Sequence, residues 1–203
     1  MVLTLTRRGY IKRINANVYH TQNKGGRGIK GMATKDEDAV NHLLYTSAHN
    51  TVLFFTNFGR VYRLKSYEIP EANSRNSNGI AAINLLPLSQ GEKVNALIDV
   101  DQVDPQANLF MATERGLVKK TSLQEFSNVR RNGLIAISLM EGDHLAKVRM
   151  TKGDQNIILA TKQGMAICFK ETDVRPMGRN TRGVRGITLA EDDMVIGADI
   201  LAD

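Results

Sequence analysis

The sequence predicts an all-β fold of the propeller type, built from four copies of one unit. Three observations predict it. A pattern of strand, Thr, two residues, Gly and strand occurs four times, a second glycine follows each copy, and few segments show helical periodicity. The first glycines lie 50, 57 and 48 residues apart, at Gly9, Gly59, Gly116 and Gly164. Four short strands in about 50 residues are typical of a propeller blade.

The first half of each repeat is predicted to be a tight β-hairpin. Residues 2–13, 52–63, 109–120 and 157–168 each contain two apolar runs separated by the Thr-x-x-Gly spacing. In such a turn one residue needs a positive φ, which glycine adopts without steric cost. We therefore expect a hairpin at the start of every repeat.

The second half of each repeat opens at a further glycine, namely Gly28, Gly79, Gly133 or Gly183. An alternating segment, an acidic or polar turn and one more apolar strand follow, as in residues 191–193 and 194–198. The repeats define four approximate blades, at 1–50, 51–107, 108–155 and 156–203, in one domain. The alternative is that a β-sandwich shows this similarity between segments by chance. The hairpin glycine and the second glycine occur in the same order in four copies, which argues against it.

Composition points to a globular protein with an anionic partner. The 203 residues are 42% hydrophobic and carry a net charge of +6. Nucleic acid is the commonest partner of such a chain. The single cysteine, Cys168, cannot form an internal disulfide and is expected in an apolar strand interior. There is no apolar run of about 20 residues and no secretory signal, so we expect a cytoplasmic protein with no membrane partner.

Lysines and arginines recur at related positions of the repeats. Repetition in register predicts a continuous basic belt around the rim of a disc, suited to a long polyanion. The predicted rim residues are Lys12, Arg13, Lys30, Arg60, Arg63, Arg75, Lys119, Lys120, Arg130, Arg131, Arg179, Arg182 and Arg185. No recognition helix is apparent, and aromatics are only 5% with no Trp, so duplex DNA bound through phosphates fits better than base readout.

A glycine-rich basic loop in the first repeat is the sharpest candidate site. It consists of Gln22, Asn23, Lys24, Gly25, Gly26, Arg27 and Gly28. Glycines let another surface approach the backbone, and exposed N–H groups beside two cations can follow a phosphate chain. Taken alone, such a loop is more often a solvated turn.

Catalytic and metal chemistry have no candidate residues. The four histidines are scattered without Cys or carboxylate partners at metal-ligand spacing. No pair of nucleophile and base and no phosphate-binding P-loop is visible. We expect a chain that is not an enzyme by itself and holds no metal.

The loop and the hairpins together resemble the C-terminal domain of the DNA gyrase A protein, part of a bacterial type IIA topoisomerase. The family's box reads Gln, two basic residues, Gly, Gly, a basic residue and Gly, and residues 22–28 match it at six of seven positions. The departure is Asn23. Residues 8–13 and 52–62 also resemble the first two blades of that domain, and the four repeats cover essentially the whole chain.

The resemblance implies a β-pinwheel, a propeller relative whose blades exchange strands, that binds, bends and wraps duplex DNA. The box would complete the wrap by which gyrase introduces negative supercoils. The resemblance also implies partners in the rest of the gyrase A protein and in the gyrase B protein, with ATP and Mg²⁺ used elsewhere in the holoenzyme and no cofactor in this fragment. The location would be the bacterial cytoplasm, at the nucleoid. The family usually has six blades, so four predict an open or truncated disc.

Two alternatives remain. The topoisomerase IV counterpart has the same fold but a degraded box, and a near-intact box argues against it. A propeller that docks proteins would show exposed apolar or aromatic loop residues and no basic belt; Phe58 is the loop aromatic that fits it.

Overall fold

The computed structural model describes residues 1–201, and they form four antiparallel sheets. The all-β prediction is confirmed. The strands are β1 (Val2–Thr6), β2 (Tyr10–Ile14), β3 (Val40–Tyr45), β4 (Thr51–Thr56), β5 (Arg60–Lys65), β6 (Ile80–Ala81), β7 (Val94–Val100), β8 (Asn108–Thr113), β9 (Leu117–Ser122), β10 (Leu134–Ile135), β11 (Leu145–Thr151), β12 (Asn156–Thr161), β13 (Ala166–Lys170), β14 (Val184–Arg185) and β15 (Val195–Leu201).

Short 3-10 turns join some of these strands. They are η1 (Ala16–Val18), η2 (Ser66–Glu68), η3 (Ala82–Asn84), η4 (Leu123–Phe126) and η5 (Glu171–Asp173). None of the helices in residues 1–201 is long and apolar enough to span a membrane.

The four predicted hairpins are present, and their glycines have the expected conformation. The φ angles of Gly9, Gly59, Gly116 and Gly164 are 86°, 73°, 86° and 88°. The threonine of the pattern has a local role as well. In the first, third and fourth hairpins its hydroxyl accepts a hydrogen bond from the backbone N–H four residues later, at 3.1 to 3.2 Å. In these three hairpins the Thr-x-x-Gly spacing sets both the turn and a side-chain contact, whereas in the second the Thr56 hydroxyl donates to Glu92.

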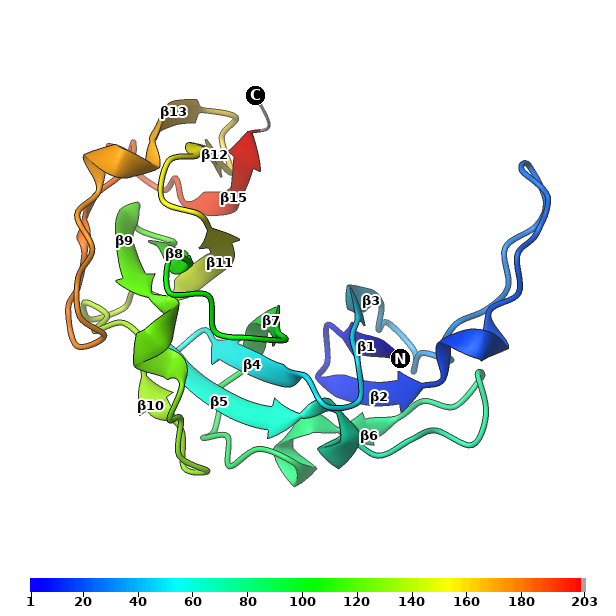
Figure 1. Cartoon of the computed structure of the whole chain (residues 1–203). Coiled ribbons are helices and arrows are strands. Elements are labelled where there is room, and N and C mark those ends of the chain that lie inside the picture. The colour runs from blue at the N-terminus through cyan, green and yellow to red at the C-terminus, as the bar shows by residue number, and fades with distance from the viewer. Residues whose placement is uncertain (202–203) are drawn as a thin grey trace. The chain divides into compact units, whose positions relative to one another are not determined.

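Each of the first three sheets is completed by a short strand donated by the following repeat. The strand orders are β3-β1-β2-β6, β10-β5-β4-β7 and β11-β8-β9-β14, whereas the fourth sheet contains β13-β12-β15. Figure 1 shows β6 beside β2 and β10 beside β5. The blades thus exchange strands, and the fourth sheet has three strands within the described residues.

The glycine that opens each donated strand is required by close packing. A Cβ on Gly79 would collide with the Ile11 carbonyl oxygen, and one on Gly183 would collide with that of Val118. Both glycines also have a positive φ, which other residues adopt at a cost. The second glycine of the repeat is therefore the residue that lets one repeat dock onto the preceding one.

Contacts divide the described chain into two compact units. Unit 1 contains Met1–Val52, Leu64–Ser89 and Asp99–Asp101, and with them the whole first sheet. Unit 2 contains Leu53–Arg63, Gln90–Ile98 and the chain from Gln102 onward, and with them the third and fourth sheets. The blade boundaries given above remain predictions.

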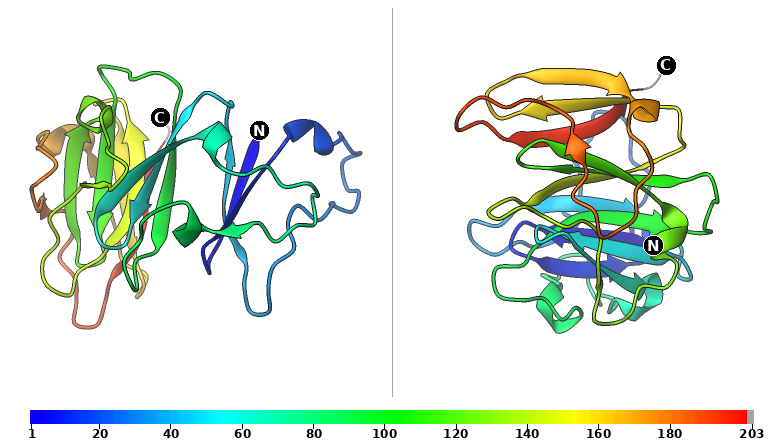
Figure 2. Two further views of the ribbon diagram at one scale, coloured as in Figure 1. Left: turned by 90° about the horizontal axis from the view of Figure 1, so that it is seen from below. Right: turned by 90° about the vertical axis from the view of Figure 1, so that its left-hand side faces the viewer.

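The central strands supply the core of each unit. In unit 1, Leu3 and Leu5 of β1 are almost fully buried, and in unit 2 Leu109 of β8 and Leu159 of β12 are as well. Burying one such side chain contributes about 1.5–3 kcal/mol. Figure 2 shows the strands of unit 2 as successive sheets, with β13 in orange at one edge.

Candidate nucleic-acid interface

The box loop, residues 22–28, lies between η1 and β3 and extends away from the first sheet (Figure 1). All seven of its residues are exposed. The Gly26 N–H donates to the Asn23 carbonyl oxygen at 3.0 Å, and Gly25 has φ 83°. A positive φ at the third position of such a turn favours glycine. The local geometry thus sets Lys24 at the tip of a glycine turn.

The cations of the box loop, and Lys30 just after it, make no polar contact through their side chains within the described residues. Among residues 1–201, no hydrogen bond or ion pair involves the side chain of Lys24, Arg27 or Lys30, and all three are exposed. A Cβ on Gly25 or Gly28 would meet no atom within 4 Å, so the backbone of the loop is open to an approaching surface. Asn23 contributes its carbonyl to the turn, and that role does not need a basic side chain.

Further exposed cations lie in the crossover segments that lead into the donated strands of unit 2. Arg130 and Arg131 lie between η4 and β10, and Arg182 lies between η5 and β14, which itself contains Arg185. All four are exposed. Two successive repeats therefore present exposed charge near their donor glycines, although not at the same repeat positions.

Other predicted rim residues are half-buried and partly occupied. Arg60 donates to the Asn132 carbonyl at 2.6 Å and lies 5.6 Å from the centroid of the Tyr62 ring. Arg63 donates to the Ser127 carbonyl at 3.0 Å. Arg75 is half-buried, and no hydrogen bond within residues 1–201 satisfies its Nε. The side chains of Arg60 and Arg63 therefore bind loop carbonyl groups as well as presenting charge.

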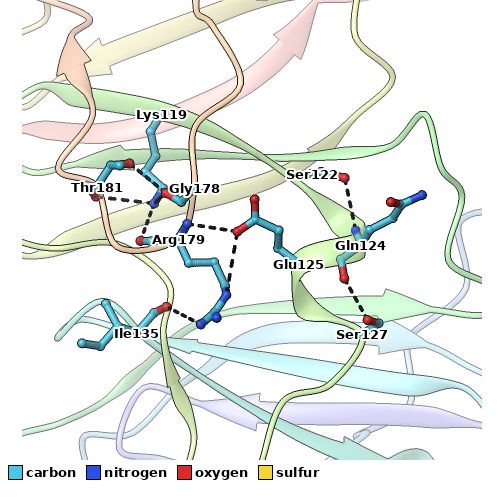
Figure 3. A network of polar contacts seen from close by, with 9 residues as sticks. All are labelled: Lys119, Ser122, Gln124, Glu125, Ser127, Ile135, Gly178, Arg179 and Thr181. Atoms are coloured by element: carbon cyan, nitrogen blue, oxygen red, sulfur yellow. Dashed lines mark hydrogen bonds and ion pairs between the residues drawn. The ribbon is translucent and has the colours of Figure 1, made fainter.

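Arg179 is also engaged, at the centre of a polar network (Figure 3). Its backbone N–H donates to the Glu125 carboxylate at 3.1 Å, and its Nε lies 3.9 Å from the same oxygen. Its Nη1 donates to the Ile135 carbonyl at 3.4 Å. The residue therefore joins its own crossover segment to η4 and β10.

The prediction that Lys119 lines an exposed rim is wrong. Its side chain is fully buried, and Nζ donates to the carbonyl oxygens of Gly178, Arg179 and Thr181 at 2.9, 2.7 and 3.4 Å (Figure 3). Burial lowers the pKa of Lys119 to about 8, with Glu125 raising it and Arg179 lowering it further. The ammonium group caps the loop that leads to the donated strand β14.

Lys12 repeats this arrangement in unit 1 and is a second correction. It is 1% exposed, and Nζ donates to the carbonyl oxygens of Arg75 and Ser77. Burial, and then the charge of Arg75, lowers the pKa of Lys12. The prediction of an exposed rim position is also wrong for Arg13 and Lys120, which are both buried. Arg13 donates to the Ile69 carbonyl at 2.7 Å, and Lys120 donates to the Glu171 carbonyl at 3.1 Å.

A comparison of the repeats gives a sequence signal for the position shared by Lys12 and Lys119. Lys12, Tyr62, Lys119 and Ile167 each lie three residues after a hairpin glycine. A repeat position that also accepts an aromatic and an aliphatic residue is suited to packing rather than to a phosphate contact. An argument from charge alone missed this packing role, because a lysine can be buried when carbonyl groups surround its ammonium.

Buried carboxylates are the polar residues that sequence reasoning missed. In unit 2, Glu92 accepts from the Thr56 hydroxyl at 2.8 Å and from the Tyr62 hydroxyl at 3.1 Å. Burial, and then the charge of Glu92, raises the pKa of Tyr62 to about 12. Glu171 accepts from the Thr151 hydroxyl and from the Gly153 N–H.

The acidic turns in the second half of the repeats form hydrogen bonds with the hairpin turns. Asp38 accepts from the N–H of Arg8 at 3.0 Å, Asp143 from that of Arg115 at 3.0 Å and Asp193 from that of Gln163 at 3.0 Å. Burial alone would raise the pKa of Asp38 and Asp193, but hydrogen bonds outweigh it and lower both pKa values below the ordinary one. The turns are therefore part of the fold.

Metal ligands do not gather anywhere in residues 1–201, where no group of three His, Cys, Asp or Glu side chains is placed to hold an ion. Cys168 corrects another expectation. It lies in β13 as predicted, but it is exposed, because β13 is the outer strand of the fourth sheet.

All four repeats match one known family. The family model described as DNA gyrase C-terminal domain, beta-propeller, matches residues 1–47, 50–101, 107–152 and 155–202. The A protein of DNA gyrase from Clostridium acetobutylicum is 52% identical over 92% of this chain, which spans 22% of that relative's length.

Two solved structures share the fold. The crystal structure of the C-terminal domain of DNA topoisomerase IV has a TM-score of 0.81 and 26% identity, over 100% of this chain and 61% of that one. A structure of the DNA gyrase A C-terminal domain has a TM-score of 0.77 and 26% identity, over 98% of this chain and 64% of that one. Strand-exchanged sheets, the box loop and the match to all four repeats lead to one conclusion: the chain belongs to the family of DNA gyrase C-terminal domains.

Proposed function

We propose that this chain binds duplex DNA without sequence preference and bends it, as the module by which DNA gyrase wraps DNA and introduces negative supercoils. The observation that carries the proposal is the box loop, in which Lys24 and Arg27 stand exposed on a glycine turn. Phosphate contacts of this kind position a duplex without reading its bases.

The other exposed cations among the predicted rim residues add to the proposed contact. Together with the box loop they give seven exposed basic side chains, namely Lys24, Arg27, Lys30, Arg130, Arg131, Arg182 and Arg185. Each cation that neutralises a phosphate releases a counterion, so affinity depends steeply on salt. Lys12, Arg13, Lys119 and Lys120 are excluded from the interface because their charges are buried against carbonyl groups.

In this proposal the chain works as part of a longer gyrase A protein, together with the gyrase B protein, in the bacterial cytoplasm. DNA cleavage and the use of ATP and Mg²⁺ belong to those other parts, and this chain contributes no catalytic residue. The topoisomerase IV counterpart is the competing assignment. The two solved structures do not separate them, because both are 26% identical, whereas the 52% identity to a gyrase A protein and the box favour gyrase.

The first test is DNA binding across a salt series. A long and a short linear duplex, each carrying a donor and acceptor dye, are titrated with the chain between about 50 and 200 mM salt. With roughly 6–10 phosphate contacts, affinity falls by about 10³–10⁵ over that range. Length-dependent binding with a change in dye distance supports wrapping. Absence of binding at low salt would contradict the proposal and favour a protein-docking propeller.

The second test uses the gyrase holoenzyme. Replacing Lys24, Gly25, Gly26 and Arg27 by alanine is expected to abolish supercoiling and leave DNA cleavage and relaxation largely intact. The matched control replaces the exposed Lys93 and Lys152, which removes the same charge outside the predicted interface. Supercoiling that survives the box substitution would show that the box does not act in this chain.

A further inference from the structure

The loop that leads into β14, residues 178–183, has its carbonyl groups occupied on one side. We call it the β14 loop. The Lys119 Nζ donates to three of its carbonyl oxygens at 2.9, 2.7 and 3.4 Å (Figure 3), those of Gly178, Arg179 and Thr181. The Asn180 carbonyl, which lies between them in the sequence, accepts from the Ser138 hydroxyl at 3.1 Å. Four consecutive carbonyl groups are therefore held by donors on β9 and on the segment after β10.

The N–H groups of the same peptide units point to the other side of the β14 loop. A trans peptide group directs its carbonyl and its N–H in opposite directions, and residues 1–201 contain no cis peptide bond. Because the carbonyls of residues 179–181 point to the two donors named above, the N–H groups of Asn180, Thr181 and Arg182 point away from those donors. Within residues 1–201, no hydrogen bond engages any of these three N–H groups. The loop thus presents three consecutive donors on its outer side.

Positive charge lies beside these donors. Arg182 is exposed, and within residues 1–201 no hydrogen bond or ion pair engages its guanidinium. Glu125 is the carboxylate that contacts the loop, and Arg179 already pairs with it. The Arg179 N–H donates to the Glu125 Oε2 at 3.1 Å, and the Arg179 Nε lies 3.9 Å from the same oxygen. Consecutive backbone N–H groups that point to one side, next to an unpaired guanidinium, suit one phosphate group.

The loop that leads into β6 shows what is different about the β14 loop. Counted back from the donor glycine, Ser74 takes the place of Gly178. The Ser74 hydroxyl accepts from the Asn76 N–H at 3.2 Å, and the Ser74 carbonyl accepts from the Ser77 N–H at 3.1 Å. Two of the three equivalent N–H groups are therefore occupied within that loop. Gly178 has no hydroxyl, and its carbonyl accepts from Lys119, so in the β14 loop the same N–H groups are left for a ligand.

We propose that the outer side of the β14 loop binds one phosphate group of the DNA backbone, and that Lys119 is the positioning residue for this contact. The N–H groups of Asn180, Thr181 and Arg182 and the Arg182 guanidinium donate to the phosphate oxygens, as backbone N–H groups commonly do in protein–DNA contacts. Lys119 is fully buried and touches no phosphate itself, but it keeps the loop carbonyls on the opposite side. The inference rests on the proposed function and adds to it a contact made by backbone groups.

Amide NMR of the isotope-labelled chain, titrated with a short linear duplex at low salt, tests the contact. The duplex is expected to shift the N–H signals of Asn180, Thr181 and Arg182, in addition to those of the box loop. Shifts in the box loop that spare these three signals would overturn the phosphate contact and leave the proposed function standing. A chain in which the duplex shifts no signal at all would contradict both proposals.

Lys119→Met tests the positioning role, and Lys152→Met is the matched control because it removes the same charge from an exposed site. In the Lys119 variant, shown to be folded by far-UV circular dichroism, the duplex is expected to shift the box-loop signals as before and to leave those of residues 180–182 unshifted. DNA affinity is expected to fall by about tenfold, the loss of one charge-assisted contact. DNA-induced shifts of residues 180–182 that persist in this variant overturn the positioning role.

Ser138→Ala is a smaller change that decides the question if Lys119→Met does not fold. It removes the hydroxyl that binds the Asn180 carbonyl and leaves Lys119 in place. The N–H of that peptide unit belongs to Thr181, so the DNA-induced shift of the Thr181 signal is expected to decrease. An unchanged Thr181 shift would show that the carbonyl contacts do not position the N–H groups.

Discussion

Strand β9 and the box loop both carry lysine, and the structure uses the two charges in opposite ways. In β9 the Lys119 ammonium is fully buried and donates to three carbonyl groups of a crossover loop. In the box loop Lys24 is exposed and makes no polar contact within residues 1–201. A repeated cation is therefore a DNA-binding candidate only where its hydrogen-bonding capacity is not consumed by the fold.

The largest effect on stability is expected from Lys119→Met. Methionine fills a similar volume but leaves the Arg179 carbonyl without a donor, whereas the Gly178 and Thr181 carbonyls still accept from the Thr181 hydroxyl and the Ser138 N–H. We expect a cost of about 1–3 kcal/mol in the free energy of unfolding. Urea denaturation measures it. Lys152→Met, at an exposed lysine, is the control and is expected to change little. A Lys119 variant as stable as the control would show that the buried ammonium does not hold the loop.

Tyr62 occupies the position of Lys119 in the second repeat and allows the same question with a neutral donor. Tyr62→Phe removes the hydroxyl that donates to the buried Glu92 carboxylate, and we expect a loss of about 1–2 kcal/mol in the free energy of unfolding. Tyr67→Phe, at a residue 54% exposed, serves as the control in the same denaturation experiment. Equal stability of the two variants would contradict a structural role for the hydroxyl.

The pH dependence of stability distinguishes the buried lysine from the exposed ones. The pKa of Lys119 is about 8 in the folded chain, against 10.5 ordinarily, so between these values the unfolded chain binds the extra proton. Stability therefore rises with pH across this window. The difference in unfolding free energy between the wild type and Lys119→Met, measured from pH 7 to 10.5, isolates this contribution. A difference independent of pH would mean that Lys119 titrates normally.

The smallest effect on stability is expected in the box loop. Lys24→Ala with Arg27→Ala removes no contact within the described residues, so the free energy of unfolding should change by less than about 0.5 kcal/mol. The slope of the logarithm of DNA affinity against the logarithm of salt concentration should fall by about 2. A stability loss as large as that of Lys119→Met would erase the distinction between the two segments.

Prediction from sequence succeeded where a residue type has one preferred local conformation. The hairpin glycines have the positive φ that was expected, and the strand expected at the end of each repeat is present in the first as β3. The box loop is an exposed glycine turn, as its composition indicated. These features depend on a few neighbouring residues, and their geometry is fixed within one turn of the chain.

Sequence reasoning failed for the cations of β2 and β9 because their surroundings come from the next repeat. The carbonyl groups around Lys12 belong to residues 63 and 65 positions further along the chain. Strand alternation gives no warning, since Ile11, Lys12 and Arg13 are all buried between two neighbouring strands. The prediction that Cys168 is buried was wrong for the opposite reason. Within residues 1–201, no strand from a following repeat covers the outer edge of β13.

The sequence alone determined the repeat, its turns and the location of an exposed basic loop, because glycine, threonine and apolar alternation act over short distances. Only the tertiary structure decided which charges face solvent and which hold the fold. The physical reason is that burial of a cation depends on carbonyl groups and carboxylates that long-range strand exchange brings to it. Lys24 and Lys119 carry the same charge, and the difference between them lies in what the following repeat places around each one.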